Sequence, residues 1–513
     1  MKPSNLSEKY ERISVQMLVR EGPSKGLLLS TSATSPKPKS TVWQAAGPGR
    51  QRPNLANIPT LNTAGTIVLG APVGSPDFVR EALETKVEKV EEITALLPNL
   101  EDPHFQFTLL RACLSLPKLA FMLRAVDTTT FRDTLEAFDS ITREALTRII
   151  GGGLSEQQWL QARLPVHLGG MGLRGAVDHA SASHISSLLA SETLVNQLLG
   201  KQDGGEEEQL PLPQALLDDL TARQGEEATI ETLTGVTQKM ISKKIDQTNL
   251  QSLKSQLDDA REVARLTSLG LPHSGAWLTS PPIPALGLHL SPVEFSLAAK
   301  YRLGCPVYDS AGPCPACQRP SDILGDHALC CSAWGERIAR HNLLRDHLHS
   351  MAASACLNPV KEGRHLLPGE QRRPADVLIP CWEGGKDAAI DVTVVNPLQQ
   401  EFVEAAAATA GYALQQAYNR KMAGAAEACA RQGLAFLPMA VESFGGWEER
   451  AVKQVRKLAS ALARQSGQEE WEAERHAFTR LSILLQKGNA TILANRFRRE
   501  VPASTDGVME GDG

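Results

Sequence analysis

The spacing of apolar residues predicts helices over most of the chain. In residues 76–97, apolar positions recur at steps of three and four with Glu and Lys on the opposite face, as in a surface helix. Residues 176–270 contain further helical segments, interrupted by an acidic, glycine-containing linker at 203–213. Two more helices are expected at 333–353 and 448–464, the second with basic residues among its polar positions. A face of that kind can track a phosphate backbone, although an ordinary solvated helix has the same pattern.

One late stretch has the pattern of a β-hairpin instead. Two apolar runs, 377–379 and 388–395, flank Gly384-Gly385, and glycine tolerates the positive φ of a tight turn. A shorter β-rich run at 66–75 is ended by glycine and proline. The first sixty residues are irregular and rich in Ser, Pro and Gly. We therefore expect an α-rich protein with an α/β segment in its last third.

Each strand of the expected hairpin carries an aspartate. Asp376 opens the first strand and Asp391 interrupts the second, and a charge in an apolar context is costly without a partner. Taken singly, either carboxylate could pair with Arg372 or Arg373. Strand alternation, however, points Asp391 away from its two apolar neighbours, and Asp376 can point to that same face. Two adjacent carboxylates repel unless a cation lies between them, so the pair indicates a metal site.

Cysteines and a histidine are clustered ahead of the hairpin. Five of the nine cysteines fall between residues 305 and 331, and in a chain this long they do not suggest a disulfide framework. A Cys-x₂-Cys pair and a His-x₃-Cys pair, the latter one helical turn apart, suit tetrahedral zinc. The expected ligands are Cys314, Cys317, His327 and Cys331, with Cys330 and Cys305 as substitutes if the register differs. Unrelated buried thiols are the competing interpretation.

Composition and charge narrow the class of protein. With 513 residues and 42% apolar content, the chain is long enough for several domains with real cores. No apolar run is long enough to cross a membrane, and the polar amino terminus lacks a signal-peptide core, so we expect an intracellular protein. The formal net charge of -5 gives no overall nucleic-acid signature, so any such binding must use local basic patches.

The segment from Arg373 through the second strand resembles the PD-(D/E)XK nuclease core, in the form found in the restriction-endonuclease-like domains of non-LTR retrotransposons. The resemblance implies that Asp376 and Asp391 hold Mg²⁺, which activates a water to attack a DNA phosphate. Ala375 separates the proline from its aspartate, and Thr393 stands where many relatives carry lysine. In the retrotransposon branch that lysine lies on a following helix, where Lys421 is the matching residue.

Other segments resemble parts of the same polyproteins in the same order. Residues 433–446 resemble the strand that closes the nuclease domain, and residues 278–304 the connector before its zinc motif. Residues 164–174 and 66–75 resemble the thumb region, and 26–43 a palm edge. No Tyr-x-Asp-Asp or Phe-x-Asp-Asp turn occurs, so the resemblance covers the part after the polymerase active site. The Gly-Gly-Met-Gly sequence lacks the Gly-Lys-Ser/Thr ending of a phosphate loop, so no nucleotide cofactor is expected.

The expected organisation follows from these segments. It comprises an irregular segment with a palm-edge remnant (1–60), a helical thumb-like region with connector (61–300), a zinc knuckle (301–333), a restriction-endonuclease-like α/β domain (334–465) and a helical tail with a disordered end (466–513). Glu362 is a further candidate ligand, suggested only by its place ahead of the first strand.

The expected function is Mg²⁺-dependent nicking of target DNA, with element RNA as a second partner and the nucleus as the place of action. The principal alternative is a catalytically dead fragment that retains zinc-stabilised nucleic-acid binding. A purely structural helical scaffold would leave the clustering of Cys and His unexplained.

Overall fold

The computed structural model describes residues 27–31, 40–44, 64–198, 212–363, 366–367 and 374–496. The chain divides into two compact units, residues 1–86 and 87–513. The first unit contains two antiparallel strand pairs, β1 (Leu27–Thr31) with β2 (Ser40–Gln44) and β3 (Gly65–Val68) with β4 (Ala71–Gly74), followed by the first half of helix α2 (Pro76–Thr94). The segment expected to be irregular therefore holds a short β-pair.

The second unit is predominantly helical before residue 304, which confirms the α-rich prediction. Its helices in this part are α3 (Pro103–Leu109), α4 (Leu116–Ala125), α5 (Arg132–Ile150), α6 (Glu156–Arg163), α7 (Ala176–Leu198), α8 (Gln214–Gln224), α9 (Ile230–Leu233), α10 (Gln238–Ser255), α11 (Ala260–Leu269) and α12 (Pro292–Leu303). Capping boxes begin α6 at Ser155 and α12 at Ser291, where each serine accepts a backbone N–H of the first turn.

The glycine-rich loop after α6 docks on α12. An added Cβ at Gly170 would lie 1.9 Å from the Leu164 carbonyl oxygen, so only glycine fits this turn. The guanidinium of Arg302, fully buried, donates to the carbonyl oxygens of Gly170 (3.1 Å) and Val166 (2.9 Å). The loop thus has the sharp turn expected from its sequence, and its role is to pack helices together.

A four-stranded sheet follows, with strand order β10-β9-β8-β7. Strands β8 (Val377–Glu383) and β9 (Lys386–Val395) form the hairpin expected from the sequence, and β7 (Val360–Lys361) extends its edge. The chain then crosses through α15 (Val403–Ala408) and α16 (Tyr412–Arg431) to β10 (Ala435–Glu442), which pairs parallel with β9. Residues 433–446 thus supply the fourth strand of this sheet.

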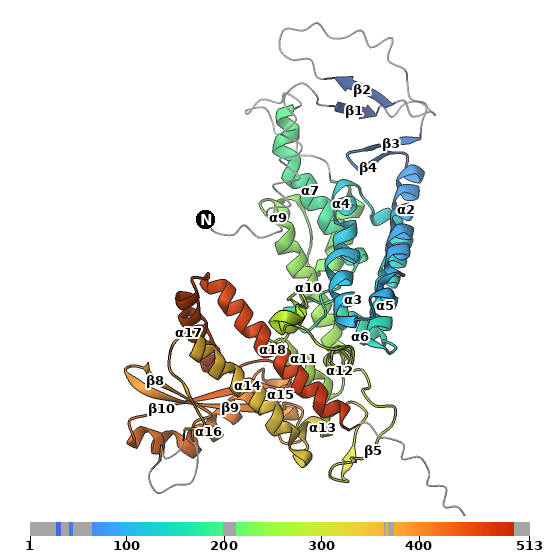
Figure 1. Ribbon diagram of the computed structural model, residues 1–513. Coiled ribbons are helices and arrows are strands. Elements are labelled where there is room, and N and C mark those ends of the chain that lie inside the picture. Colours follow the sequence, from blue (N-terminus) through green and yellow to red (C-terminus); the bar gives the residue numbers. More distant parts are fainter. Residues whose placement is uncertain are drawn as a thin grey trace, which may run out of the picture. The chain divides into compact units, whose positions relative to one another are not determined.

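Helices cover both faces of the sheet (Figure 1). One face packs against α14 (Glu336–Ser354), α17 (Glu449–Ser466) and α18 (Glu470–Ala494) through a core that includes Ile390 and Val392. The other face packs against α16, with Ala389 in its core. Because Asp391 lies between Ile390 and Val392, alternation directs it to the α16 face, as predicted.

Helix α18 lies in the segment 466–513, which was expected as a helical tail, and it packs into three cores. Its residues contribute to the core under the sheet, to the core of α12 and to the core around the knuckle, through Phe478, Ile483 and Leu493 respectively. A helix that is apolar on several faces is a central element, because each face needs an apolar neighbour. Residues 87–513 are grouped in one compact unit.

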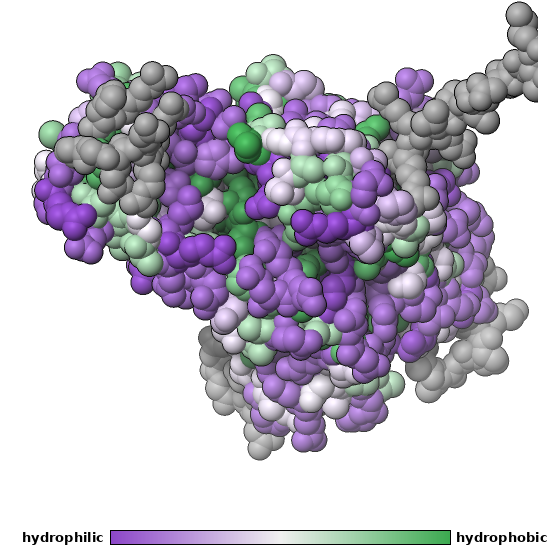
Figure 2. Space-filling view, turned by 90° about the horizontal axis from the view of Figure 1, so that it is seen from below, coloured by the Kyte–Doolittle hydropathy of each residue, from purple (hydrophilic) through white to green (hydrophobic). Residues whose placement is uncertain are grey.

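Within the described part of the chain, none of the helices is both long and apolar enough to span a membrane. The face of the molecule drawn in Figure 2 is mainly hydrophilic, with hydrophobic residues gathered mostly in a recess near its middle.

Candidate metal centre and acidic site

The four expected zinc ligands meet at one point. The ligand atoms of Cys314, Cys317, His327 and Cys331 all lie within 4.8 Å of one another, and Cys317 Sγ is 3.2 Å from His327 Nε2. Tetrahedral zinc with Zn–S bonds of about 2.3 Å separates its sulfur ligands by about 3.8 Å. Three thiolates this close repel one another unless a cation lies among them, so the donor set fits zinc. This cluster could bind zinc.

Short-range turns present these ligands. Strands β5 (Gly312–Pro313) and β6 (Pro320–Ser321) flank the first cysteine pair, and Gln318 closes their turn with a positive φ of 62°. The carboxylate of Asp322 accepts the backbone N–H groups of Asp326 (3.0 Å) and His327 (2.8 Å), which begins helix α13 (Asp326–Cys330). Burial would raise the pKa of Asp322, but these hydrogen bonds hold it below its ordinary value.

The two substitute cysteines, Cys330 and Cys305, lie outside the Cys/His cluster. Cys330 Sγ accepts a hydrogen bond from Asn396 Nδ2 at 3.3 Å, and Cys305 is buried in the core beneath α12. Burial raises the pKa of both thiols to about 11, which disfavours the thiolate that zinc requires. For Cys314, backbone N–H groups of Ala316 and Cys317 outweigh burial and lower the pKa. Cys331 is therefore the fourth member of the Cys/His cluster, and neither substitute belongs to it.

The two aspartates of the hairpin lie side by side. Val377 pairs with Ile390, so Asp376, directly before β8, stands opposite Asp391 in the same register. Asp376 Oδ2 accepts the backbone N–H of Val392 at 2.7 Å, and the two carboxylates are close enough to share a proton. The structure thus brings together the two residues that the sequence pattern singled out.

A lysine and a histidine flank the aspartates. Lys421 reaches from α16, and its Nζ is 2.7 Å from Asp391 Oδ2 and 3.0 Å from Asp391 Oδ1. His341 reaches from α14, and its Nε2 is 3.1 Å from Asp376 Oδ1. Lys421 was expected from the resemblance, whereas His341 was not among the expected site residues. Arg372 and Arg373, the pairing partners considered from the sequence, lie outside the described residues.

The pKa values of the two carboxylates are shifted in opposite directions. Burial, together with the negative charge of Asp376, raises the pKa of Asp391 to about 6, although Lys421 opposes the shift. Burial acts on Asp376 too, but the contact with His341 and the N–H of Val392 outweigh it and lower its pKa. One carboxylate therefore ionises easily and the other resists, which is the behaviour of two like charges sharing one site.

Glu362 does not join this pair. Its carboxylate forms an ion pair with Arg345 of α14, and its backbone, at a positive φ of 50°, donates to the carbonyl oxygen of Asp376 at 2.9 Å. Among the described residues, the Cys/His cluster is the sole group of three or more His, Cys, Asp and Glu side chains that gather around one point. The expectation that Glu362 is a third ligand stays a prediction, with its carboxylate paired to Arg345 in this structure.

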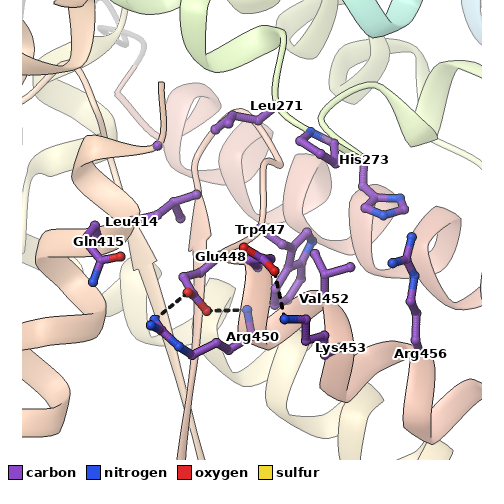
Figure 3. A pocket seen from close by; sticks show the side chains of 13 residues that line it. Leu271, His273, Leu414, Gln415, Trp447, Glu448, Arg450, Val452, Lys453 and Arg456 are labelled. Atoms are coloured by element: carbon purple, nitrogen blue, oxygen red, sulfur yellow. Dashed lines mark hydrogen bonds and ion pairs between the residues drawn. The ribbon is translucent and has the colours of Figure 1, made fainter. Parts of the chain in front are cut away.

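The basic helix expected at 448–464 is α17, but its charges are largely neutralised. Four cations form ion pairs within the chain: Arg450 with Glu448, Lys453 with Glu449, Arg456 with Glu474 and Lys457 with Glu383. Three of these cations line a cavity of about 590 Å³ between the start of α17, the start of α16 and the turn at His273, with Leu271 and Trp447 at its wall (Figure 3). These pairs favour the solvated-helix interpretation over a phosphate track.

Glu442, at the end of β10, is a residue that sequence reasoning missed. Its side chain is fully buried, and neither carboxylate oxygen makes a hydrogen bond of acceptable geometry among the described residues. Burial raises its pKa from 4.5 to about 8, and the nearby Ser268 hydroxyl opposes this only weakly. The folded chain therefore holds Glu442 protonated at neutral pH.

Glu442→Gln should change how stability depends on pH. Below pH 4.5 the protonated Glu442 carboxyl makes its full contribution to the free energy of unfolding. This contribution falls as pH rises toward 8, because Glu442 ionises at a lower pH in the unfolded chain than in the folded chain. The total loss is on the order of 5 kcal/mol. In thermal melts between pH 5 and 8, the melting temperature of Glu442→Gln should rise relative to that of the wild type as pH increases. Parallel curves for the two proteins would mean that Glu442 is ionised in the fold.

Comparison of the chain with protein-family models and with curated proteins found no match.

Proposed function

We propose that this chain is the carboxy-terminal part of a non-LTR retrotransposon polyprotein and acts as a metal-dependent DNA endonuclease. The observation that carries the proposal is the meeting of Asp376, Asp391 and Lys421 on one face of the sheet, from two strands and the crossover helix. Such a group of two carboxylates and a lysine suits phosphodiester hydrolysis. The Cys/His cluster adds support, because the ligand spacing that predicted it belongs to the same resemblance.

In this proposal Asp376 and Asp391 hold Mg²⁺. Their fit rests on chemistry: both are hard oxygen donors, and the burial and the neighbouring charge of Asp376 that raise the pKa of Asp391 are effects that a bound cation would oppose. When bound, the metal supplies a Lewis acid and lowers the pKa of a bound water. The chemistry it would supply is hydrolysis of one P–O ester bond of DNA by water, which would leave a nick.

The chain's own residues prepare this reaction. Lys421, which is ion-paired with Asp391, would place its ammonium where it can stabilise negative charge on a phosphate oxygen at the pair. His341 and the N–H of Val392 each bond one oxygen of Asp376 and so fix its orientation. The zinc knuckle, joined to the start of α14 through Cys331, has a structural role in this proposal. Chromosomal DNA would place the protein in the nucleus, with element RNA as a second partner.

A plasmid assay tests the proposed function. The full chain, incubated with supercoiled plasmid, should convert it to open circles in Mg²⁺ and leave it intact in EDTA. Zinc content and DNA affinity are measured on the same preparation. A zinc-loaded protein that binds DNA but never nicks it would favour the alternative, a catalytically dead nucleic-acid-binding fragment.

A further inference from the structure

The cavity at the start of α17 has an aromatic wall. The imidazole of His273 stacks on the buried ring of Phe478, with 3.5 Å between the ring centroids and 6° between the ring planes. Burial, together with the nearby charge of Arg456, lowers the pKa of His273 to about 4, so the imidazole is uncharged at neutral pH. Phe478 covers one face of this neutral ring, and the rest of the ring lines the cavity.

The cavity has the size and the mixed lining of a small-molecule site. Its volume of about 590 Å³ lies in the range of about 300–1,000 Å³ that is usual for such sites. Leu271 and Leu414 give it apolar sides, and in Figure 3 His273 and Arg456 lie across the cavity from Leu414 and Gln415. These walls suit a flat ligand with an apolar face and polar edges. A nucleobase has these properties.

Hydrogen-bond donors border the same cavity. Arg456 is paired with Glu474 through Nε at 2.7 Å, and Lys453 is paired with Glu449 at 2.8 Å. Both cationic side chains are more than half exposed, and ion pairs so exposed contribute little to stability. Each cation has further N–H groups, which can donate to the acceptor atoms on the edge of a base. The pairs that disfavour a phosphate track on α17 are therefore compatible with a single bound base.

Helix α16 connects the cavity to the acidic pair. Leu414, Tyr418 and Lys421 follow steps of four and three residues inside the regular helix, so they lie along one side of it. Leu414 lines the cavity, and Lys421 pairs with Asp391. At a rise of about 1.5 Å per residue, Leu414 and Lys421 are about 10 Å apart along the helix axis. This length corresponds to about three steps of a stacked strand at about 3.4 Å each.

A direct contact joins the cavity to the same side of α16. The guanidinium of Arg450 lies 4.4 Å from the ring centroid of Tyr418, the middle residue of the row, and Arg450 also lines the cavity. The wall of the cavity and the side of α16 that leads to Lys421 are therefore in contact through this cation and ring.

We propose that the cavity at His273 takes one unpaired nucleobase of the DNA strand whose phosphate lies at Asp376 and Asp391, with the base stacked against the imidazole. The base is unpaired because a base within a duplex is already stacked on its neighbours and has no free face. This inference rests on the proposed function. It implies a preference for DNA with an unpaired nucleotide within about three positions of the nick.

Filling the cavity tests this inference. Gln415 is exposed and lines the cavity, so the indole of Gln415→Trp should occupy it without disturbing a buried core. A labelled duplex with a short unpaired bubble is compared with the perfect duplex by fluorescence anisotropy, in EDTA to prevent cleavage. The wild type should prefer the bubble. Gln415→Trp should weaken bubble binding about tenfold, as the loss of one stacked base predicts, and leave binding to the perfect duplex unchanged.

Ala430→Trp is the matched control, because it adds the same ring at an exposed position near the other end of α16. This variant should bind both DNAs like the wild type. Removing the wall gives a second measurement. His273→Ala should also weaken bubble binding about tenfold, and His273→Phe, which keeps an uncharged ring, should restore most of the affinity.

A bubble affinity of Gln415→Trp equal to or above that of the wild type would overturn the inference, as would an equal loss on both DNAs. A protein side chain as the natural occupant of the cavity would give the first of these results. Failure of the proposed function is distinct, because it appears as absent Mg²⁺-dependent nicking by the wild type whatever the bubble affinities.

Discussion

Asp391→Asn should abolish Mg²⁺-dependent nicking, with a rate at least about 10³-fold below wild type. A metal ligand contributes several kcal/mol to transition-state stabilisation, and each 1.4 kcal/mol corresponds to about tenfold in rate. Asparagine keeps the size and shape of the side chain and removes one charge from the pair. Because Asp391 already resists ionisation, with its pKa raised to about 6, the fold should tolerate the change.

Asp387→Asn is the matched control for this prediction. Asp387 lies on the same strand and accepts the backbone N–H of Cys381 at 3.0 Å, an interaction that an asparagine oxygen can keep. This variant should nick at the wild-type rate. Equal nicking by Asp391→Asn and wild type would place the nuclease centre elsewhere. The zinc content and DNA affinity of both variants should match the wild type, which separates loss of chemistry from loss of fold.

Cys331→Ser should release zinc from the knuckle. Purified wild-type protein should contain about one equivalent of zinc, and structural zinc in small knuckles supplies about 10–16 kcal/mol of apparent binding energy at pH 7. With one thiolate lost, metal content should fall toward zero, and residues around the cluster should become sensitive to proteolysis. Elemental analysis and limited digestion measure the two effects.

Cys330→Ser tests the register of the ligands. Its sulfur lies against Asn396 rather than in the cluster, and a serine hydroxyl can keep that hydrogen bond. This variant should retain its zinc. Loss of zinc from Cys330→Ser with retention in Cys331→Ser would reverse the assignment.

The parts of the site that depend on local spacing could be predicted from the sequence. The Cys-x₂-Cys and His-x₃-Cys pairs each lie within a turn, so their geometry follows from short-range rules. The shared face of Asp376 and Asp391 follows from strand alternation across a two-residue turn. Lys421 is separated from Asp391 by a whole crossover, and only the resemblance pointed to it.

Long-range packing accounts for what was missed. His341 contacts Asp376 because α14 packs against β8 and β9, and the sequence of α14 alone does not reveal these neighbours. Helix α18 was expected as a tail because its own sequence does not show which cores its residues enter. In the folded chain those residues belong to three separate cores. Glu442 ends an apolar strand whose burial arises from helices distant in the sequence, so its unpartnered carboxyl gave no local signal.

The acidic pair is tested most directly by soaking crystals of the protein with Mn²⁺ and recording anomalous diffraction. Manganese takes the same oxygen ligands as magnesium and provides an anomalous signal. One peak is expected between the carboxylates of Asp376 and Asp391, with Lys421 displaced from Asp391, and Asp391→Asn should remove it while the zinc peak remains. An ordered pair without a manganese peak, with Lys421 still bound to Asp391, would contradict a metal-dependent nuclease site.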